Sequence, residues 1–117
     1  MIQNATTQEV LAEQTILVKS FFGQAHGLMF RKPLTNQGWV FLLKRASKWH
    51  LTNLFVFFAI DALWLDKDKN VLQKKTLQPF QLHAAGIANT RYVIELHAGS
   101  AKNVRVGDRI SWDKKVL

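Results

Sequence analysis

The sequence predicts an α+β fold that is mainly β, a small antiparallel barrel or sandwich with two short helices. The chain of 117 residues is as long as one ordinary domain, so we expect a single domain over residues 1–117. Hydrophobic residues make up 48% and charged residues 21%, which favours a packed core over disorder. Short apolar stretches recur between polar turn segments, and helical periodicity is weak by comparison. This pattern favours strands joined by turns over alternating strand and helix units.

We predict strands where β-branched and aromatic residues cluster or where apolar and polar residues alternate. Residues 9–19 end in TILVK, and we expect them to pair with residues 2–5 across the polar turn between them. The clearest alternation is in RYVIELH, where Tyr92, Ile94 and Leu96 share one face. The remaining predicted strands are residues 38–43, 55–65, 71–77, 91–97 and 110–112.

Two segments have weaker helical signals. Residues 20–29 are predicted to form a helix that Ser20 caps, because their apolar residues lie near one face. The segment AGSAKNV, residues 98–104, is expected to form one or two helical turns. Residues 66–70, DKDKN, imitate the start of an EF-hand loop, but Val71 replaces the required glycine, so we predict a hairpin turn there.

Several kinds of functional site are excluded or unsupported by the residue types present. The chain has no cysteine, which removes disulfides, thiolate nucleophiles and iron–sulfur ligation. Its four histidines lack metal-ligand spacing, and its six glycines form neither a Walker loop nor a dinucleotide fingerprint. We therefore predict no metal and no cofactor. The most apolar run, residues 54–65, is far shorter than the ~20 residues of a spanning helix, so we expect a soluble, cytoplasmic protein without a membrane partner.

Asp61 is the most informative single residue of the sequence. Both faces of the predicted strand 55–65 are apolar, which is typical of a central strand and predicts a buried carboxylate at Asp61. A buried carboxylate needs hydrogen bonds or a cation, so we expect at least two hydrogen bonds, from backbone amides or from Arg31, His50 or Arg91. Two interpretations stay open: a structural anchor that accepts backbone amides, or a ligand-binding or acid–base group in a pocket.

A second feature is the basic, acid-free stretch of residues 14–60. Its lysines and arginines are interleaved with aromatic residues. This composition fits single-stranded nucleic acid, whose phosphates attract cations and whose bases stack on aromatic rings. Lys44, Arg45 and Lys48 are the candidate nucleic-acid-binding residues, because they lie close together around one predicted loop. The alternative is that the aromatic residues belong to the core and the cations to a solvated surface.

Four motifs, in order, carry a resemblance to a known family: GLMFRKPL at 27–34, FFAIDALWLDKDKNV at 57–71, RYVIELHAGS at 91–100 and VGDRI at 106–110. The chain resembles archaeal-type members of the prokaryotic family called domain of unknown function 192. It departs from the family pattern at Ala59, where proline is usual, at Lys69, where glycine is usual, and in LHAGS, where the family has LPAGT. The resemblance implies a compact β-rich domain with flanking short helices, but no reaction, since the activity of the family is not established. The residues that match the family's motifs are Gly27, Met29, Arg31, His50, Asn53, Asp61, Arg91, Glu95, Gly99, Gly107 and Asp108.

We therefore expect a non-catalytic binding module for a small polar or anionic ligand, with Arg31, His50, Asn53 and Asp61 near one pocket. A nucleic-acid-associated basic protein is the alternative. A second alternative is a hydrolase with His50 and Asp61 as an acid–base pair, although no complete set of nucleophile, base and orienting group is visible. The question of enzyme activity stays open, with binding favoured over catalysis. Convergence of the four ligand-binding candidates on one concave site would distinguish these hypotheses.

Overall fold

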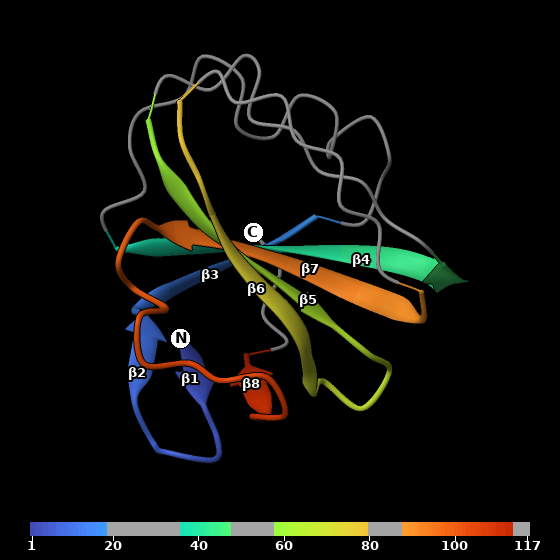
Figure 1. Ribbon diagram of the computed structural model, residues 1–117. Coiled ribbons are helices and arrows are strands. Elements are labelled where there is room, and N and C mark those ends of the chain that lie inside the picture. Colours follow the sequence, from blue (N-terminus) through green and yellow to red (C-terminus); the bar gives the residue numbers. More distant parts are fainter. Residues whose placement is uncertain (19–35, 48–57, 80–87, 114–117) are drawn as a thin grey trace.

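Two β-sheets form the part of the protein that the computed structural model describes, which is residues 1–18, 36–47, 58–79 and 88–113 (Figure 1). The smaller sheet has the strand order β2-β1-β8 and consists of β1 (Ile2–Asn4), β2 (Val10–Ala12) and β8 (Ile110–Trp112). The larger sheet has the strand order β3-β4-β7-β5-β6 and consists of β3 (Gln14–Val18), β4 (Gln37–Ser47), β5 (Ile60–Leu65), β6 (Val71–Leu77) and β7 (Thr90–His97).

The smaller sheet brings together strands from the two ends of the chain. β1 pairs antiparallel with β2 across the polar turn and antiparallel with β8 on its other side. The predicted strand 9–19 is divided: its first part, β2, pairs with β1 as expected, whereas its TILV part belongs to β3 of the larger sheet. The buried Asn4 fixes the turn, because its Oδ1 accepts hydrogen bonds from the backbone amides of Thr6 (3.0 Å) and Thr7 (3.3 Å). Its Nδ2 donates to Asp108 Oδ2 at 2.9 Å, so both ends of the side-chain amide are satisfied.

The larger sheet begins where β2 ends, since only Glu13 separates β2 from β3. β3 pairs with β4 in parallel, and the remaining pairs in this sheet are antiparallel. β5 lies between β7 and β6 and is buried along its whole length. The prediction of a central strand around Asp61 is therefore confirmed.

Each face of the larger sheet carries an apolar cluster, because successive residues of a strand point to opposite faces. The first core cluster lies between the two sheets, and its largest members are Ile2, Leu11, Val40, Leu63, Leu65, Ile94, Leu96 and Ile110. The second core cluster, on the opposite face, consists of Trp39, Phe41, Ile60, Ala62, Trp64, Leu77 and Val93. Gly38 allows the close approach of the sheets, since a Cβ there would overlap Ile2 Cδ1 and lie 2.9 Å from Leu96 Cδ2.

The predicted α+β class with two short helices is wrong for the described residues, which form strands and turns but no helix. The segment 98–104 consists of successive turns, in which Ser100 N donates to His97 O and Val104 N to Ala101 O. Gly99 has a φ of +93°, outside the helical region, and the hydrogen bonds of the segment join residues three apart rather than four apart as in an α-helix. The other predicted helix, residues 20–29, lies outside the described residues.

The predicted small antiparallel barrel or sandwich also needs correction. The larger sheet contains one parallel pair, and in the described ranges its edge strands β3 and β6 do not pair, so no barrel closes. β4, β7 and β5 lie between these two edge strands (Figure 1). The β-rich character itself is confirmed.

The hairpin turn predicted for residues 66–70 is confirmed, since it joins β5 to β6. Asp66 Oδ1 accepts the backbone amides of Asp68 and Asn70, each at 2.9 Å, and Lys69 adopts a left-handed φ of +68°.

In the part of the chain that Figure 1 draws in colour, no helix is long and apolar enough to cross a membrane.

Candidate functional site

A buried carboxyl group on the second face of the larger sheet is the most unusual chemical feature of the described residues. Glu95 lies in the middle of β7, where its side chain alternates with that of Ile94 and shares a face with Val93. It is 3% exposed, and Glu95 Oε2 has no hydrogen-bond partner among the residues that the structure describes. A buried oxygen without a hydrogen bond is uncommon in folded proteins and needs an explanation.

Burial also changes the acidity of this group. Desolvation raises the pKa of Glu95 from 4.5 to about 8, because the carboxylate form loses the water that would stabilise its charge. At neutral pH the side chain is therefore mostly a neutral carboxylic acid. In that form it has one O–H donor and a carbonyl acceptor on the same group.

The strand register defines the neighbours of Glu95. Trp39 of β4 is its partner on one side and Ala62 of β5 on the other, and Ala62 in turn faces Lys75 of β6. We call these four residues the Glu95 row. Two strand spacings place the Cα atoms of Glu95 and Lys75 roughly 9–10 Å apart, with only the methyl group of Ala62 between them in the row. Lys75 is partly buried and has no hydrogen bond or ion pair with another described residue.

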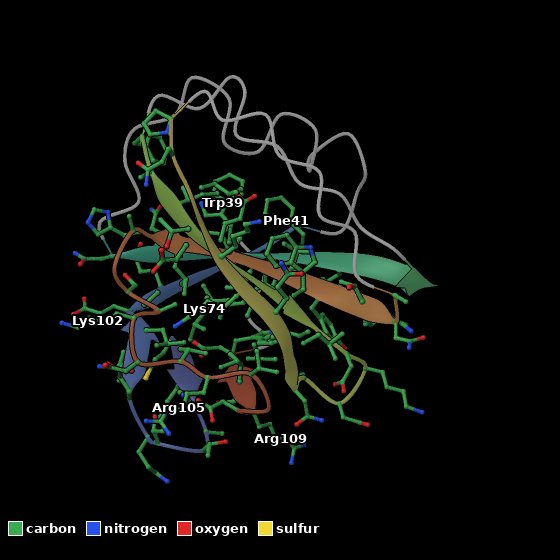
Figure 2. All side chains as sticks on the ribbon, in the orientation of Figure 1. Trp39, Phe41, Lys74, Lys102, Arg105 and Arg109 are labelled. Carbon is green, nitrogen blue, oxygen red and sulfur yellow. The ribbon has the colours of Figure 1, made fainter. Side chains whose placement is uncertain are left out.

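Aromatic rings stand beside the carboxyl group on the same face. The Trp39 and Phe41 ring centroids are 6.2 Å apart, with the ring planes inclined by 32° (Figure 2). Trp64, two residues beyond Ala62 on β5, belongs to the same cluster and is fully buried. Tryptophan and phenylalanine surfaces are typical linings of sites for small molecules, in which a few polar groups fix the orientation of the ligand.

Asp61 lies on the opposite face and has different surroundings. It is 3% exposed, and its Oδ2 accepts the backbone amides of Gly99 (2.9 Å) and Ala101 (3.0 Å). Its Oδ1 accepts the Thr76 hydroxyl at 2.7 Å. The expectation of at least two hydrogen bonds is confirmed, and the donors are the backbone amides and Thr76 rather than Arg91, which shares the Glu95 face.

Most of the predicted site residues lie where the structure gives no side chain. Arg31, His50 and Asn53 are outside the described residues, and so is Lys48. Lys44 and Arg45 belong to β4, but only their backbone is described. Convergence of the predicted ligand-binding residues on one site therefore stays a prediction. A metal site is not apparent either: no group of three or more histidine, aspartate or glutamate residues in the described ranges could hold an ion.

Sequence reasoning placed Glu95 on a strand and among the family's motif residues without proposing it as a site. Local alternation put Val93 and Glu95 on one face, but it gave no partner for that face. In the sheet Glu95 lies between Trp39 and Ala62, which come from strands distant in the sequence. The sequence offered one signal for Glu95, which is a single acidic residue within the alternating strand 91–97. In the structure this strand, β7, lies next to β5, whose two faces are both apolar.

Comparison with known proteins identifies relatives along nearly the whole chain. The UPF0127 protein of Pyrococcus abyssi is 31% identical over 100 residues, which are 82% of this chain and 83% of that protein. A crystal structure of a Novosphingobium aromaticivorans protein of unknown function superposes with a TM-score of 0.74 at 23% identity, over 84% of this chain and 74% of that one. A second crystal structure, of a Sinorhizobium meliloti protein described provisionally as a transcription regulator, gives a TM-score of 0.73 at 23% identity, over 83% of this chain and 79% of that one.

The solved structures support the two-sheet fold, and the sequence comparisons identify the family. The family model DUF192, described as uncharacterized ACR, matches residues 2–112. That match contains every described strand, from β1 to β8. The archaeal relative agrees with the archaeal-type resemblance found in the motifs. The chain therefore belongs to the DUF192 family.

Proposed function

We propose that this protein is a binding module for a small polar or anionic ligand, and that the ligand binds at the Glu95 row. The observation that carries the proposal is the Glu95 carboxyl group, which is buried beside aromatic rings and has an oxygen without a hydrogen bond to any described residue. Leaving such a group unsatisfied costs about 1–3 kcal/mol. A ligand that forms the missing hydrogen bond removes that cost.

The charges of the row favour a ligand that presents hydrogen-bond acceptors. The neutral Glu95 carboxyl can donate its O–H, and the Lys75 ammonium group can donate on the other side of Ala62. An ionised Glu95 would repel an anion, and its raised pKa prevents this repulsion at neutral pH. The rings of Trp39 and Phe41, both buried in the second core cluster, give the carboxyl group apolar surroundings.

Binding fits the contacts of Asp61 better than hydrolysis does. The hydrolase hypothesis needs Asp61 to exchange a proton with His50. Asp61 accepts hydrogen bonds from Gly99, Ala101 and Thr76, and these occupy both of its oxygens. Such contacts are typical of a carboxylate that holds a loop in place, so they support a structural role for this residue.

Benzoate is a suitable probe, because it combines a carboxylate with an aromatic ring. We expect benzoate at pH 6.5 to shift the amide resonances of β4 and β7 in a two-dimensional NMR titration. Affinity should fall as the pH rises through 8, since Glu95 then ionises. Glu95→Gln keeps a donor and an acceptor and should bind without this pH dependence. Glu95→Leu and Lys75→Met should bind at least tenfold more weakly than the wild type.

Lys67→Met serves as the control, because Lys67 is exposed in the hairpin turn and its exchange removes the same charge as Lys75→Met. It should bind benzoate like the wild type. Shifts that are scattered over the protein, or that persist unchanged in Glu95→Leu, would contradict the proposed site. Folding of each variant is checked by its circular dichroism spectrum.

Nucleic-acid association is the second candidate function. The formal charge of +8 favours binding to phosphates at low salt, and the basic stretch 14–60 contains Lys44, Arg45 and Lys48. The provisional description of the Sinorhizobium meliloti protein as a transcription regulator is compatible with this candidate, although the likeness is one of fold. If these residues bind single strands, replacing all three with alanine should weaken binding and flatten its salt dependence, which a fluorescence anisotropy titration measures.

A further inference from the structure

Four basic residues gather around the loop of residues 98–109, on the side of the larger sheet opposite Glu95. Lys102, Arg105 and Arg109 are exposed on this loop, and Lys74 of β6 lies beside it (Figure 2). Lys74 Nζ donates to the backbone oxygens of Ala101 (3.1 Å) and Lys102 (3.3 Å), so this lysine helps to hold the loop. We call Lys102, Arg105 and Arg109 the loop cations.

The loop cations form no ion pairs with the described acidic residues, although the charge of Arg105 acts on the nearby Asp108 and the Glu9 carboxylate accepts a hydrogen bond from Asn103 of the loop. Within the described ranges, none of the three side chains takes part in a hydrogen bond or an ion pair. The only carboxylate of the loop belongs to Asp108, and its Oδ2 accepts the backbone amide of Arg105 and the side-chain amide of Asn4, each at 2.9 Å. These two hydrogen bonds lower the pKa of Asp108, so the carboxylate stays ionised while it serves the fold.

The backbone that carries the loop cations is fixed at several points. At its start, the amides of Gly99 and Ala101 bind Asp61. Near its end, Gly107 N donates to Val71 O and Val71 N donates to Asp108 O, each at 2.8 Å. Ala101 and Val104 are also buried in the first core cluster. A charged surface on such a fixed frame loses little conformational entropy when it binds a partner.

We propose that the loop cations form a second binding surface, separate from the Glu95 row, and that its partner is the phosphate backbone of duplex nucleic acid. Three unpaired cations on a fixed loop can contact successive phosphates, and the +8 charge of the chain strengthens the attraction. Residues 98–109 contain no aromatic residue. The loop therefore lacks the aromatic rings on which unpaired bases usually stack in proteins that bind single strands.

Other anionic partners fit this surface less well. A membrane surface would require several apolar side chains to enter the lipid, and the loop offers one large exposed apolar residue, Val106, which is 67% exposed. A protein interface usually has an apolar or aromatic centre surrounded by polar residues, and cations flank the lone valine here. Contacts with phosphates need neither feature.

The test measures binding of a 20-base-pair DNA duplex by fluorescence anisotropy between 50 and 300 mM salt. The loop variant replaces Lys102, Arg105 and Arg109 with glutamine. A rival variant replaces Lys44, Arg45 and Lys48 with glutamine and so loses the same three charges. We expect the loop variant to bind on the order of 100-fold more weakly than the wild type at 100 mM salt, with the slope of log K against log salt smaller in magnitude by about 3. The rival variant should lose less than tenfold.

Several outcomes would overturn the inference. Equal losses in the two variants would mean that net charge alone attracts the duplex, and a larger loss in the rival variant would locate the surface at β4. Absence of duplex binding at 50 mM salt, or tighter binding to polyglutamate or to anionic vesicles than to the duplex, would reject nucleic acid as the partner. Because the exchanged side chains of the loop are exposed, the loop variant should keep the wild-type circular dichroism spectrum, and its benzoate titration at Glu95 should be unaffected.

Discussion

Replacing Glu95 with glutamine should stabilise the protein at neutral pH, because glutamine keeps the shape of the side chain and removes its titration. Burial raises the pKa of Glu95 from 4.5 to about 8 in the folded protein, whereas the unfolded chain keeps the ordinary value. Below pH 4.5 both states hold the proton, so the carboxyl group costs no stability through ionisation. Between pH 4.5 and 8 the unfolded chain releases a proton that the folded protein retains, and the stability of the wild type falls as the pH rises.

The size of the effect follows from the difference between the two pKa values. Each pH unit within the interval lowers the free energy of unfolding by about 1.36 kcal/mol. The loss is therefore about 3 kcal/mol at pH 7, and it levels off near roughly 5 kcal/mol above pH 8. A typical domain has a total stability of only about 5–15 kcal/mol. Glu95→Gln should thus be almost as stable as the wild type at pH 4 and about 3 kcal/mol more stable at pH 7.

Urea denaturation at pH 4, 5.5, 7 and 8.5, followed by circular dichroism and tryptophan fluorescence, measures the difference. Glu13→Gln is the control, because Glu13 is exposed and its exchange removes the same charge. The control should follow the pH dependence of the wild type. If the stabilities of Glu95→Gln and the wild type instead run parallel from pH 4 to 8.5, then Glu95 ionises in the folded protein as it does in water. That result would refute both the burial argument and the neutral donor of the proposed site.

Three further predictions concern stability and are tested by the same denaturation measurement. Asp61→Asn should lower the free energy of unfolding by only about 1 kcal/mol, because its oxygen can still accept both loop amides and its NH₂ can donate to the Thr76 hydroxyl. Asp61→Ala leaves those amides without a hydrogen bond and should cost about 3 kcal/mol or more. Equal losses in the two variants would contradict this geometry. Gly38→Ala should cost about 1–3 kcal/mol, since its Cβ overlaps Ile2, and an unchanged midpoint would show that the sheets can separate freely. Lys69→Gly should leave the stability nearly unchanged, because glycine adopts the left-handed φ without strain, a gain of about 1 kcal/mol that offsets the loss of the Lys69 contact 4.2 Å above the Trp112 ring. Lys69→Ala loses the contact and keeps the strain, so it should be less stable than the wild type and than Lys69→Gly.

Strand positions could be predicted from the sequence because alternation is a local property. The buried Asp61 followed from the two apolar faces of one strand, and Tyr92, Ile94 and Leu96 were assigned to one face correctly. The hydrogen-bond donors of Asp61 could not be identified individually, because β6 and the loop after β7 are brought to β5 only by the complete sheet. The segment 98–104 failed as a helix because its hydrogen bonds join residues three apart and Gly99 has a φ of +93°, features that the apolar pattern did not reveal.

The candidate site shows the same limit more strongly. Nothing near Glu95 in the sequence reveals that Trp39 and Ala62 flank it, because the sheet order β4-β7-β5 differs from the order of the strands along the chain. The basic stretch 14–60 drew attention to Lys44 and its neighbours by composition. The loop cations, in contrast, are recognised only in the structure, because they have no ion-pair partner among the described residues. The nearby Asp108 carboxylate accepts hydrogen bonds from Asn4 and from the backbone amide of Arg105, and the sequence does not reveal these contacts.

The pairing of β1 with β8 has a consequence for synthesis of the protein. β1 is made first, but its neighbour β8 begins only at Ile110, more than 100 residues later. The smaller sheet therefore cannot be completed until β8 has been synthesised, and Ile2 has no partner from β8 until then. Closure of such a distant contact is slow compared with formation of a local hairpin. We expect the nascent chain to expose the apolar side of β4, β5 and β7 until β8 is available, a period in which a chaperone that binds exposed apolar strands would prevent aggregation.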